Sequence, residues 1–370
     1  AMAISRDLRI EAAGNITQAT GTHINVTGFA DLTTTGNDIT LGAGNSDAFT
    51  ATTLRLSADN VTVTDTAAGI TFSGDTDITG TLNLTAQDTI TDGATATVSV
   101  GGAATFDVVA STGDILLDNA NHLDGVVTVT AARDVVLNNT DSGTTLGDID
   151  ITGDLIVTTS GLIDQNAGTR FVVCGNAQFD AQDAAIQLTA TANDVVGTVS
   201  LNNTGNEAVA FTQTGALTLG ASSVGSAALT VIATGAITQT GALVQAVGAE
   251  EAALTVARFE TAGAAITLDH NDNVLTQAVS AQNTGVHTIH FVNSTHLVLD
   301  DVQTAGDFTL HVDGALTQSA NGVSVGGLTD MTAKSIRLGN NPSFSTEEVR
   351  FDSDGLAEIN FTQGNNAKIV

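Results

Sequence analysis

The sequence predicts an all-β protein, a parallel β-solenoid in which short strands stack coil upon coil. Three observations predict this fold class: a long internal repeat, short runs of alternating apolar and polar residues, and a near absence of proline. The chain has 370 residues, of which 38 are Gly and one is Pro. Proline deletes a hydrogen bond of the strand ladder, so its scarcity fits a chain built of paired strands.

The repeat is visible in short phrases of one small residue, one aliphatic residue and a polar pair. These phrases follow one another in steps of 74, 73, 74 and 79 residues, and their aliphatic residues are Ile16, Ile90, Ile163, Ile237 and Leu316. A fixed period of this kind is typical of stacked repeat architectures. We expect a single continuous rod over 1–370, with three or four coils in each unit, and we interpret the aliphatic residues as equivalent inward-facing positions. The approximate units are 14–88, 89–161, 162–235, 236–314 and an incomplete 315–370.

Within each unit, runs such as "TLRLS", "VTVTD" and "TLNLT" place every second side chain on one face. This period of two is the mark of a half-buried strand, and Gly, Asn and Asp between the runs are turn signals. A propeller blade is too short for this unit and usually carries Trp or Tyr, both absent here. A β-sandwich domain needs a longer unit, so stacked coils with aliphatic ladders fit best.

The fourth unit is irregular. We expect insertions at approximately 244–253 and 269–288, which should leave the stacked core as loops. The stretch 243–259 is rich in Ala and Glu, which allows a short helix or a looped insertion. Loops on a rigid scaffold often carry binding residues, so this unit is where we expect function.

Charge excludes one class of partner. Forty acidic residues against ten basic ones give a formal net charge of -30, which repels nucleic acid. No apolar run is long enough to cross a membrane, so we expect no direct membrane insertion. We expect no cofactor beyond a weak association of calcium with so acidic a surface. The single cysteine, Cys174, has apolar neighbours and is expected to be buried.

Two acidic stretches are candidates for a metal site. In the fourth unit Asp269, His270 and Asp272 could bind a divalent metal together with His287 or His290. Near the end of the chain, Asp352 and Asp354 precede a glycine like half of a calcium loop. The plainer interpretation is a solvated loop in the first case and an acidic turn in the second, because neither stretch has a recognised ligand spacing.

The phrases "GNITQ", "TGNDITL", "GDLIVTTSGLIDQ" and "LTVIATGAITQTGAL" resemble those of the filamentous-haemagglutinin-like adhesins, large bacterial surface proteins. The resemblance covers most of the chain and implies a right-handed parallel β-helix without catalysis. It also implies secretion to the bacterial cell surface and attachment to a receptor or glycan on a host or neighbouring cell. The chain lacks the Asn-Pro-Asn-Gly type motif of the family's secretion domain, and we expect it to be an internal fragment.

Two alternatives remain open. The chain could be a self-assembling extracellular filament or surface-layer component, in which exposed terminal coils associate end to end. It could also be a polysaccharide-binding or polysaccharide-degrading β-helix. Catalysis is disfavoured because enzymes of that kind need a single cluster of acids in a cleft, usually with aromatic residues, whereas the acids here recur with the turns.

Overall fold

The computed structural model describes residues 1–44, 47–65, 67–140, 143–248, 255–339, 342–344, 349–353 and 359–361. These residues form 41 strands and no helix, and the strands pair in parallel as a β-solenoid of about 16 turns. The predicted fold class is therefore confirmed. Among these residues we find no helix with the length and apolar character of a membrane span. The chain divides into two compact units, 1–181 and 182–370, which are described separately.

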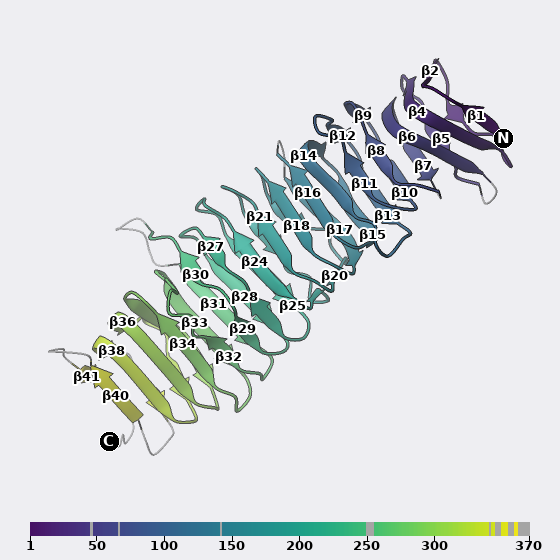
Figure 1. Ribbon diagram of the computed structural model, residues 1–370. Coiled ribbons are helices and arrows are strands. Elements are labelled where there is room, and N and C mark those ends of the chain that lie inside the picture. Colours follow the sequence, from purple (N-terminus) through teal and green to yellow (C-terminus); the bar gives the residue numbers. More distant parts are fainter. Residues whose placement is uncertain are drawn as a thin grey trace. The chain divides into compact units, whose positions relative to one another are not determined.

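The first unit has two main stacks of parallel strands, and Figure 1 shows how the strands follow one another from coil to coil. We call them stack A and stack B. Stack A consists of β3 (Ile16–Thr17), β5 (Ile39–Leu41), β7 (Val61–Asp65), β10 (Leu82–Ala86), β13 (Ala104–Val108), β15 (Val126–Ala132), β17 (Thr144–Ile151) and β19 (Ile163–Gln165). Stack B consists of β2 (Leu8–Ala12), β4 (His23–Thr34), β6 (Ala48–Ala58), β8 (Ile70–Phe72), β11 (Ile90–Asp92), β14 (Ile115–Leu123), β16 (Val135–Asn139), β18 (Leu155–Thr159) and β21 (Ala177–Asp180). Short strands add a third side to some coils: β1 (Met2–Ile4), β9 (Thr76–Ile78), β12 (Val98–Val100) and β20 (Phe171–Val173).

The second unit also has two main stacks, which we call stack C and stack D. Stack C consists of β22 (Ile186–Leu188), β25 (Val209–Gln213), β28 (Leu229–Ala233), β31 (Val256–Thr261), β33 (Ala278–Asn283), β35 (Leu297–Thr304) and β37 (Val323–Val325). Stack D consists of β24 (Thr198–Asn202), β26 (Leu217–Leu219), β29 (Ile237–Gln239), β32 (Ile266–Leu268), β34 (Ile289–Asn293), β36 (Phe308–Gln318), β38 (Thr329–Leu338) and β40 (Val349–Ser353). The remaining strands are β23 (Asp194–Val195), β27 (Ser222–Val224), β30 (Leu243–Gln245), β39 (Ser343–Phe344) and β41 (Ile359–Phe361).

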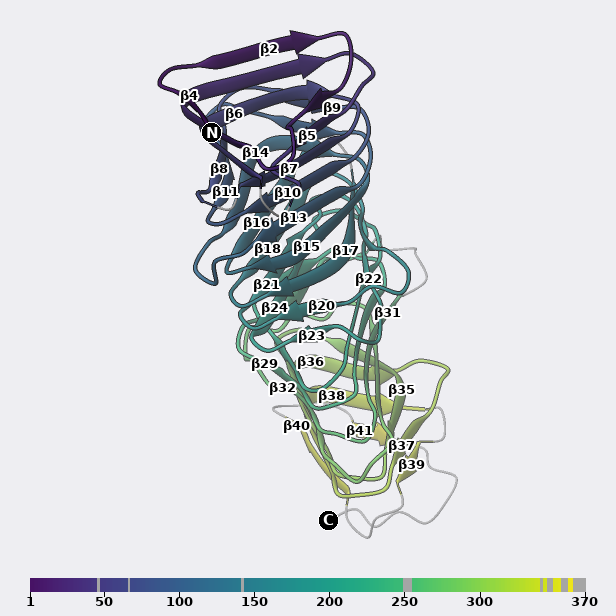
Figure 2. The same ribbon diagram turned by 90° about the vertical axis from the view of Figure 1, so that its right-hand side faces the viewer.

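Aliphatic ladders form the core of each unit. In stack A, Ile16 pairs with Ile39, Ile39 with Val61 and Val61 with Leu82, so one inward column runs through successive coils. The period of two in the sequence produces this column, because alternate side chains of a strand point to opposite faces. In Figure 2, β2, β4 and β6 lie one below another in the same manner.

The sequence repeat does not coincide with a whole number of coils. Three coils separate Ile16 from Leu82, which is 66 residues further on, and the repeat places Ile90 another 8 residues later. Ile90 lies in stack B, where it pairs with Ile70 and Ile115. All five marker residues of the repeat are buried, as predicted. The interpretation of them as equivalent positions is wrong, because successive repeats begin on different stacks.

Acidic and amide side chains extend the ladder at the corners of the coils. The N–H of Asp134 donates to Asp114 Oδ1 at 3.2 Å, the N–H of Asp154 to Asp134 Oδ1 at 2.9 Å, and the N–H of Asn176 to Asp154 Oδ1 at 2.7 Å. A backbone N–H that leaves the strand ladder needs another acceptor, and short carboxylates and amides are suited to supply it locally. Many acids of this chain are therefore structural.

A second polar position lies inside the coils and returns with the repeat. Asp65, Asn139, Gln213 and Asn293 follow one another in steps of 74, 74 and 80 residues, and each is nearly inaccessible to solvent. The side-chain amide of Asn139 both accepts from the N–H of Leu123 and donates to its C=O, each at 3.1 Å. Gln213 pairs with the backbone of Val195 in the same way, and Asn293 with that of Leu275. The side chain thus replaces a peptide group of a neighbouring strand.

Three expectations need correction. Residues 269–288 do not leave the core as a loop, because β33 lies within them and pairs with β31 and β35; its small and aliphatic residues suit burial. The stretch 243–259 contains no helix among its described residues, which include β30 and the start of β31. Residues 249–253 of the insertion expected at 244–253 lie outside the described part of the chain. Cys174 is exposed, since it follows the inward-facing Val173 and alternation turns it outward.

Candidate functional site

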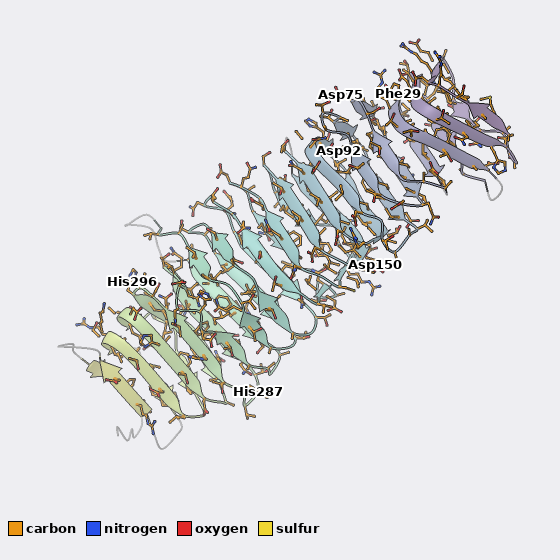
Figure 3. All side chains as sticks on the ribbon, in the orientation of Figure 1. Phe29, Asp75, Asp92, Asp150, His287 and His296 are labelled. Atoms are coloured by element: carbon orange, nitrogen blue, oxygen red, sulfur yellow. The ribbon has the colours of Figure 1, made fainter. Side chains whose placement is uncertain are left out.

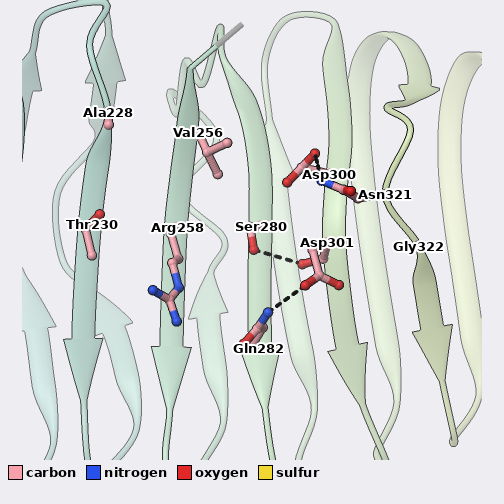
Figure 4. Close-up of a pocket in the computed structure, with 10 residues that line it drawn as sticks. All are labelled: Ala228, Thr230, Val256, Arg258, Ser280, Gln282, Asp300, Asp301, Asn321 and Gly322. Carbon is pink, nitrogen blue, oxygen red and sulfur yellow. Dashed lines mark hydrogen bonds between the residues drawn. The ribbon is translucent and has the colours of Figure 1, made fainter.

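A hollow in the described surface lies on the outer face of stack C. It is a groove of about 580 Å³ that crosses four neighbouring strands (Figure 4). Its described lining residues are Ala228, Thr230, Val256, Arg258, Ser280, Gln282, Asp300, Asp301, Asn321 and Gly322. The groove therefore lies in the part of the chain where the repeat is irregular.

Strand β33 forms the floor of the groove. Most strands of this chain alternate between buried and partly exposed residues, but every residue from Leu275 to Ala281 is buried. Val279 and Ala281 point into the core, whereas Ala278 and Ser280 occupy the outward positions. Their side chains are too short to rise above the neighbouring strands, and this leaves the hollow.

A β-bulge in β35 forms one wall. Val279 pairs with Leu299 and Ala281 pairs with Val302, so two residues of β35, Asp300 and Asp301, stand opposite the single residue Ser280. A bulge re-aims side chains out of the regular pleat. Ser280 Oγ donates to the backbone oxygen of Asp301 at 3.0 Å, which ties the bulge to the floor.

Hydrogen bonds fix both carboxylates of the bulge. Asp301 Oδ2 accepts from Gln282 Nε2 at 2.7 Å, and Asp301 Oδ1 accepts from Gln303 Nε2 at 2.9 Å. Asp300 Oδ1 accepts from Ser319 Oγ at 2.6 Å and from Asn321 Nδ2 at 2.8 Å. Each carboxylate still has lone pairs for a further donor, because an ionised carboxylate offers about four acceptor sites.

Arg258 forms the opposite wall. It stands between Thr230 and Ser280 in the outward column of stack C. Its guanidinium forms an ion pair with Glu260 on the same strand, and its side chain is 43% exposed. A guanidinium has five N–H donors in a fixed plane, so this pair leaves donors that can reach a ligand in the groove.

The structure brings the residues predicted as metal ligands together only in pairs. His270 Nδ1 lies 3.9 Å from Asp272 Oδ2, and His290 Nδ1 lies 3.9 Å from Asp269 Oδ2. His287 lies exposed in the connection between β33 and β34, and Figure 3 shows it remote from His296. Among the residues that the structure describes, no three His, Cys, Asp or Glu side chains gather closely enough to hold a metal ion.

The second predicted metal stretch is described only in part. Asp352 is exposed in β40, where it stands opposite Thr332 of β38. Asp354 lies outside the described residues. The prediction of a divalent-metal site stays a prediction that titration with zinc and calcium can test.

Two buried acids, Asp65 and Asp92, lie in the first unit, whereas all the residues of the groove belong to the second unit. Burial raises the pKa of Asp92, although hydrogen bonds from Asn121, Asn119 and Asp118 oppose the rise. Burial also raises the pKa of Asp65, against hydrogen bonds from the backbone of Ala67 and Ala68. Asp65 Oδ2 has no hydrogen-bond partner among the described residues. Both acids stand where the coils need an acceptor, and we interpret them as structural.

Comparison with known families identifies the repeat. The model of a family described as repeats of unknown function (DUF5649) matches five successive segments, 1–55, 58–130, 132–202, 206–282 and 285–347. The chain belongs to this family. The last four family repeats begin 74, 74 and 79 residues apart, within one residue of the steps of 73, 74 and 79 between the last four phrases in the sequence. No curated protein and no solved structure matches the chain.

The groove lies across the fourth and fifth family repeats, with its floor strand at the end of the fourth. The sequence pattern indicated a functional site in this region, but it pointed to the histidines and not to the groove. One signal was present: "QAVSA", 277–281, has small residues where other strands carry Thr, Asn or charged residues. The bulge at Asp300 and Asp301 has no such signal, because it depends on the register against β33.

Proposed function

We propose that the chain is a non-catalytic scaffold segment of a secreted bacterial surface adhesin, and that the groove on stack C is its binding surface. The observation that supports this best is the contrast between the regular coils and the hollow on the outer face of stack C. Regular coils are held by ladders and corner hydrogen bonds that have no evident chemical role. The groove is the place where outward side chains are arranged around a space.

The resemblance to filamentous-haemagglutinin-like proteins supports the same proposal. A chain of stacked coils with a formal net charge of -30 stays soluble and resists nonspecific association, which suits a protein that works outside the cell. A groove fixed on rigid strands suits recognition, because little conformational freedom is lost when a ligand binds.

An adhesion assay tests the proposal. Beads coated with the chain are expected to attach to bacterial or epithelial cell layers more often than beads coated with serum albumin. Attachment equal to that of the albumin beads on every cell layer would refute the proposal. Electron microscopy of the purified chain provides a second measurement, because long fibres would favour the self-assembling filament instead.

A further inference from the structure

We propose that the groove on stack C binds a neutral saccharide, with Asp300, Asp301 and Arg258 as the residues that contact its hydroxyl groups. This inference deepens the proposed function and rests on it, since it names the ligand of the same surface. It follows from four properties of the groove: its donors and acceptors, their fixed orientation, its charge and its size.

The first property is the kind of polar group in the groove. A sugar hydroxyl both donates and accepts a hydrogen bond, so a site for neighbouring hydroxyls needs strong acceptors and strong donors within one space. Asp300 and Asp301 supply acceptors on one wall, and Arg258 supplies donors on the other. Hydrogen bonds to charged groups are stronger than those between neutral groups, which favours these three residues over Thr230.

The second property is preorganisation. Gln282 and Gln303 hold the carboxylate of Asp301, while Ser319 and Asn321 hold that of Asp300. Side chains that are held by their neighbours lose little freedom when a ligand arrives, so more of the interaction appears as affinity. Figure 4 shows the hydrogen bonds from Gln282 to Asp301 and from Asn321 to Asp300.

The third property is charge. Glu260 compensates Arg258, so the two carboxylates of the bulge give the groove a negative character. The chain as a whole adds a formal charge of -30. Repulsion therefore disfavours uronic acids, sulfated sugars and sialic acid, and favours neutral sugars.

The fourth property is size. A volume of about 580 Å³ lies within the range of small-molecule sites and holds one or two sugar rings. None of the ten described lining residues is aromatic, so no ring can stack on a sugar face. We therefore expect weak affinity, with a Kd on the order of 1 mM, which corresponds to about 4 kcal/mol of binding free energy.

Saturation-transfer NMR and calorimetric titration on the full chain test the proposal. The probes are neutral mono- and disaccharides (glucose, galactose, mannose, N-acetylglucosamine and their dimers), with digalacturonate as the acidic comparison. We expect at least one neutral sugar to bind and digalacturonate to bind more weakly than that sugar. Three variants test the groove residues: Arg258→Ala and Asp301→Asn each remove a contact, and Ser280→Gln fills the floor. Each should weaken binding about tenfold, the typical effect of losing one charged hydrogen bond.

Two matched variants in the first unit provide controls. Arg133 also forms an ion pair on the surface and its side chain is 48% exposed, so Arg133→Ala removes a similar group. Ser99 occupies an outward position in β12, so Ser99→Gln adds the same side chain away from the groove. Both controls should bind the sugar as the unchanged chain does.

Several results would overturn the proposal. They are the absence of binding by every neutral sugar, binding that all three groove variants leave unchanged, and stronger binding of digalacturonate. Calcium binding that Asp301→Asn abolishes, without any sugar binding, would make the groove a cation site instead. Because the titration needs no cells, failure here with successful cell attachment would reject the saccharide and keep the adhesive role.

Discussion

The buried amide of Asn139 offers a sharp test of how the coils are held together. We expect Asn139→Asp to destabilise the first unit although the two side chains have nearly the same shape. Asn139 is fully buried, and its Nδ2 donates to Leu123 O at 3.1 Å, to Gly143 O at 3.0 Å and to Thr144 Oγ1 at 3.1 Å. In the variant a carboxylate oxygen would take the place of Nδ2 and face two carbonyl oxygens, with only the hydroxyl of Thr144 beside it able to donate, while the N–H of Leu123 would still donate to the other oxygen.

The expected cost follows from this geometry. A buried charge without a partner costs about 3 to 5 kcal/mol, and we expect the free energy of unfolding at neutral pH to fall by about that amount. Urea unfolding followed by circular dichroism measures it. The matched control is Asn83→Asp, which adds the same charge to an exposed position of β10 and should change the free energy by less than about 0.5 kcal/mol.

The pH dependence adds a second criterion. When the new carboxyl of Asn139→Asp takes up a proton it can donate again, so its penalty should shrink as the pH is lowered. If Asn139→Asp and Asn83→Asp unfold at the same urea concentration, the side chain does not replace a peptide group and the reasoning fails.

The remaining predictions concern other buried and exposed positions. Asp65→Asn should stabilise the first unit by about 1 to 2 kcal/mol at neutral pH relative to the exposed control Asp77→Asn, because a neutral amide replaces a carboxyl with an unpartnered oxygen; equal urea midpoints would contradict this. The folded-state pKa values of Asp65 and Asp92 are raised above 3.8. The stability that these two groups contribute is therefore fully present below pH 3.8 and is lost as the pH rises through the raised pKa values. The urea concentration at the unfolding midpoint of the unchanged chain should accordingly increase when the pH is lowered from neutral. Phe106→Ala should cost about 3 to 5 kcal/mol, since it empties a fully buried site; a loss below about 1 kcal/mol in the same assay would refute tight packing there. Cys174 is exposed and should react with a thiol reagent in the folded protein about as fast as in urea; strong protection would place it in the core after all.

The sequence was informative wherever a local pattern determines the structure. Alternation in "VTVTD" and "TLNLT" placed Val61 and Leu82 inward, and the corner Gly, Asn and Asp residues marked the turns. The apolar neighbours of Cys174 were misleading because burial in a strand depends on parity rather than on average hydropathy.

The parts that the sequence did not reveal depend on contacts between coils. The sequence shows the period of the repeat but not the number of residues in one coil. It therefore could not show that Ile16 and Ile90 belong to different stacks. The groove arises because Ser280 is short between Arg258 and a bulge, and those three elements come from three successive coils. The metal hypothesis grouped Asp269, His270 and Asp272 because they are close in sequence, whereas strands stacked in register bring together residues about 20 apart, such as Asp269 and His290.

The mismatch between repeat and coil also bears on how such a chain can change in length. In the first unit a repeat spans three coils and 8 further residues. The second unit shows the same relation, because Phe308 lies three coils after Ile237 in the same stack and Leu316 follows 8 residues later. Duplicating a single repeat would therefore transfer every downstream side chain to the other stack, while duplicating two would bring Ile16-like positions back to their own stack, as Ile163 is brought back to stack A. Lineages that need a binding face to keep its direction should accordingly gain or lose these repeats in pairs.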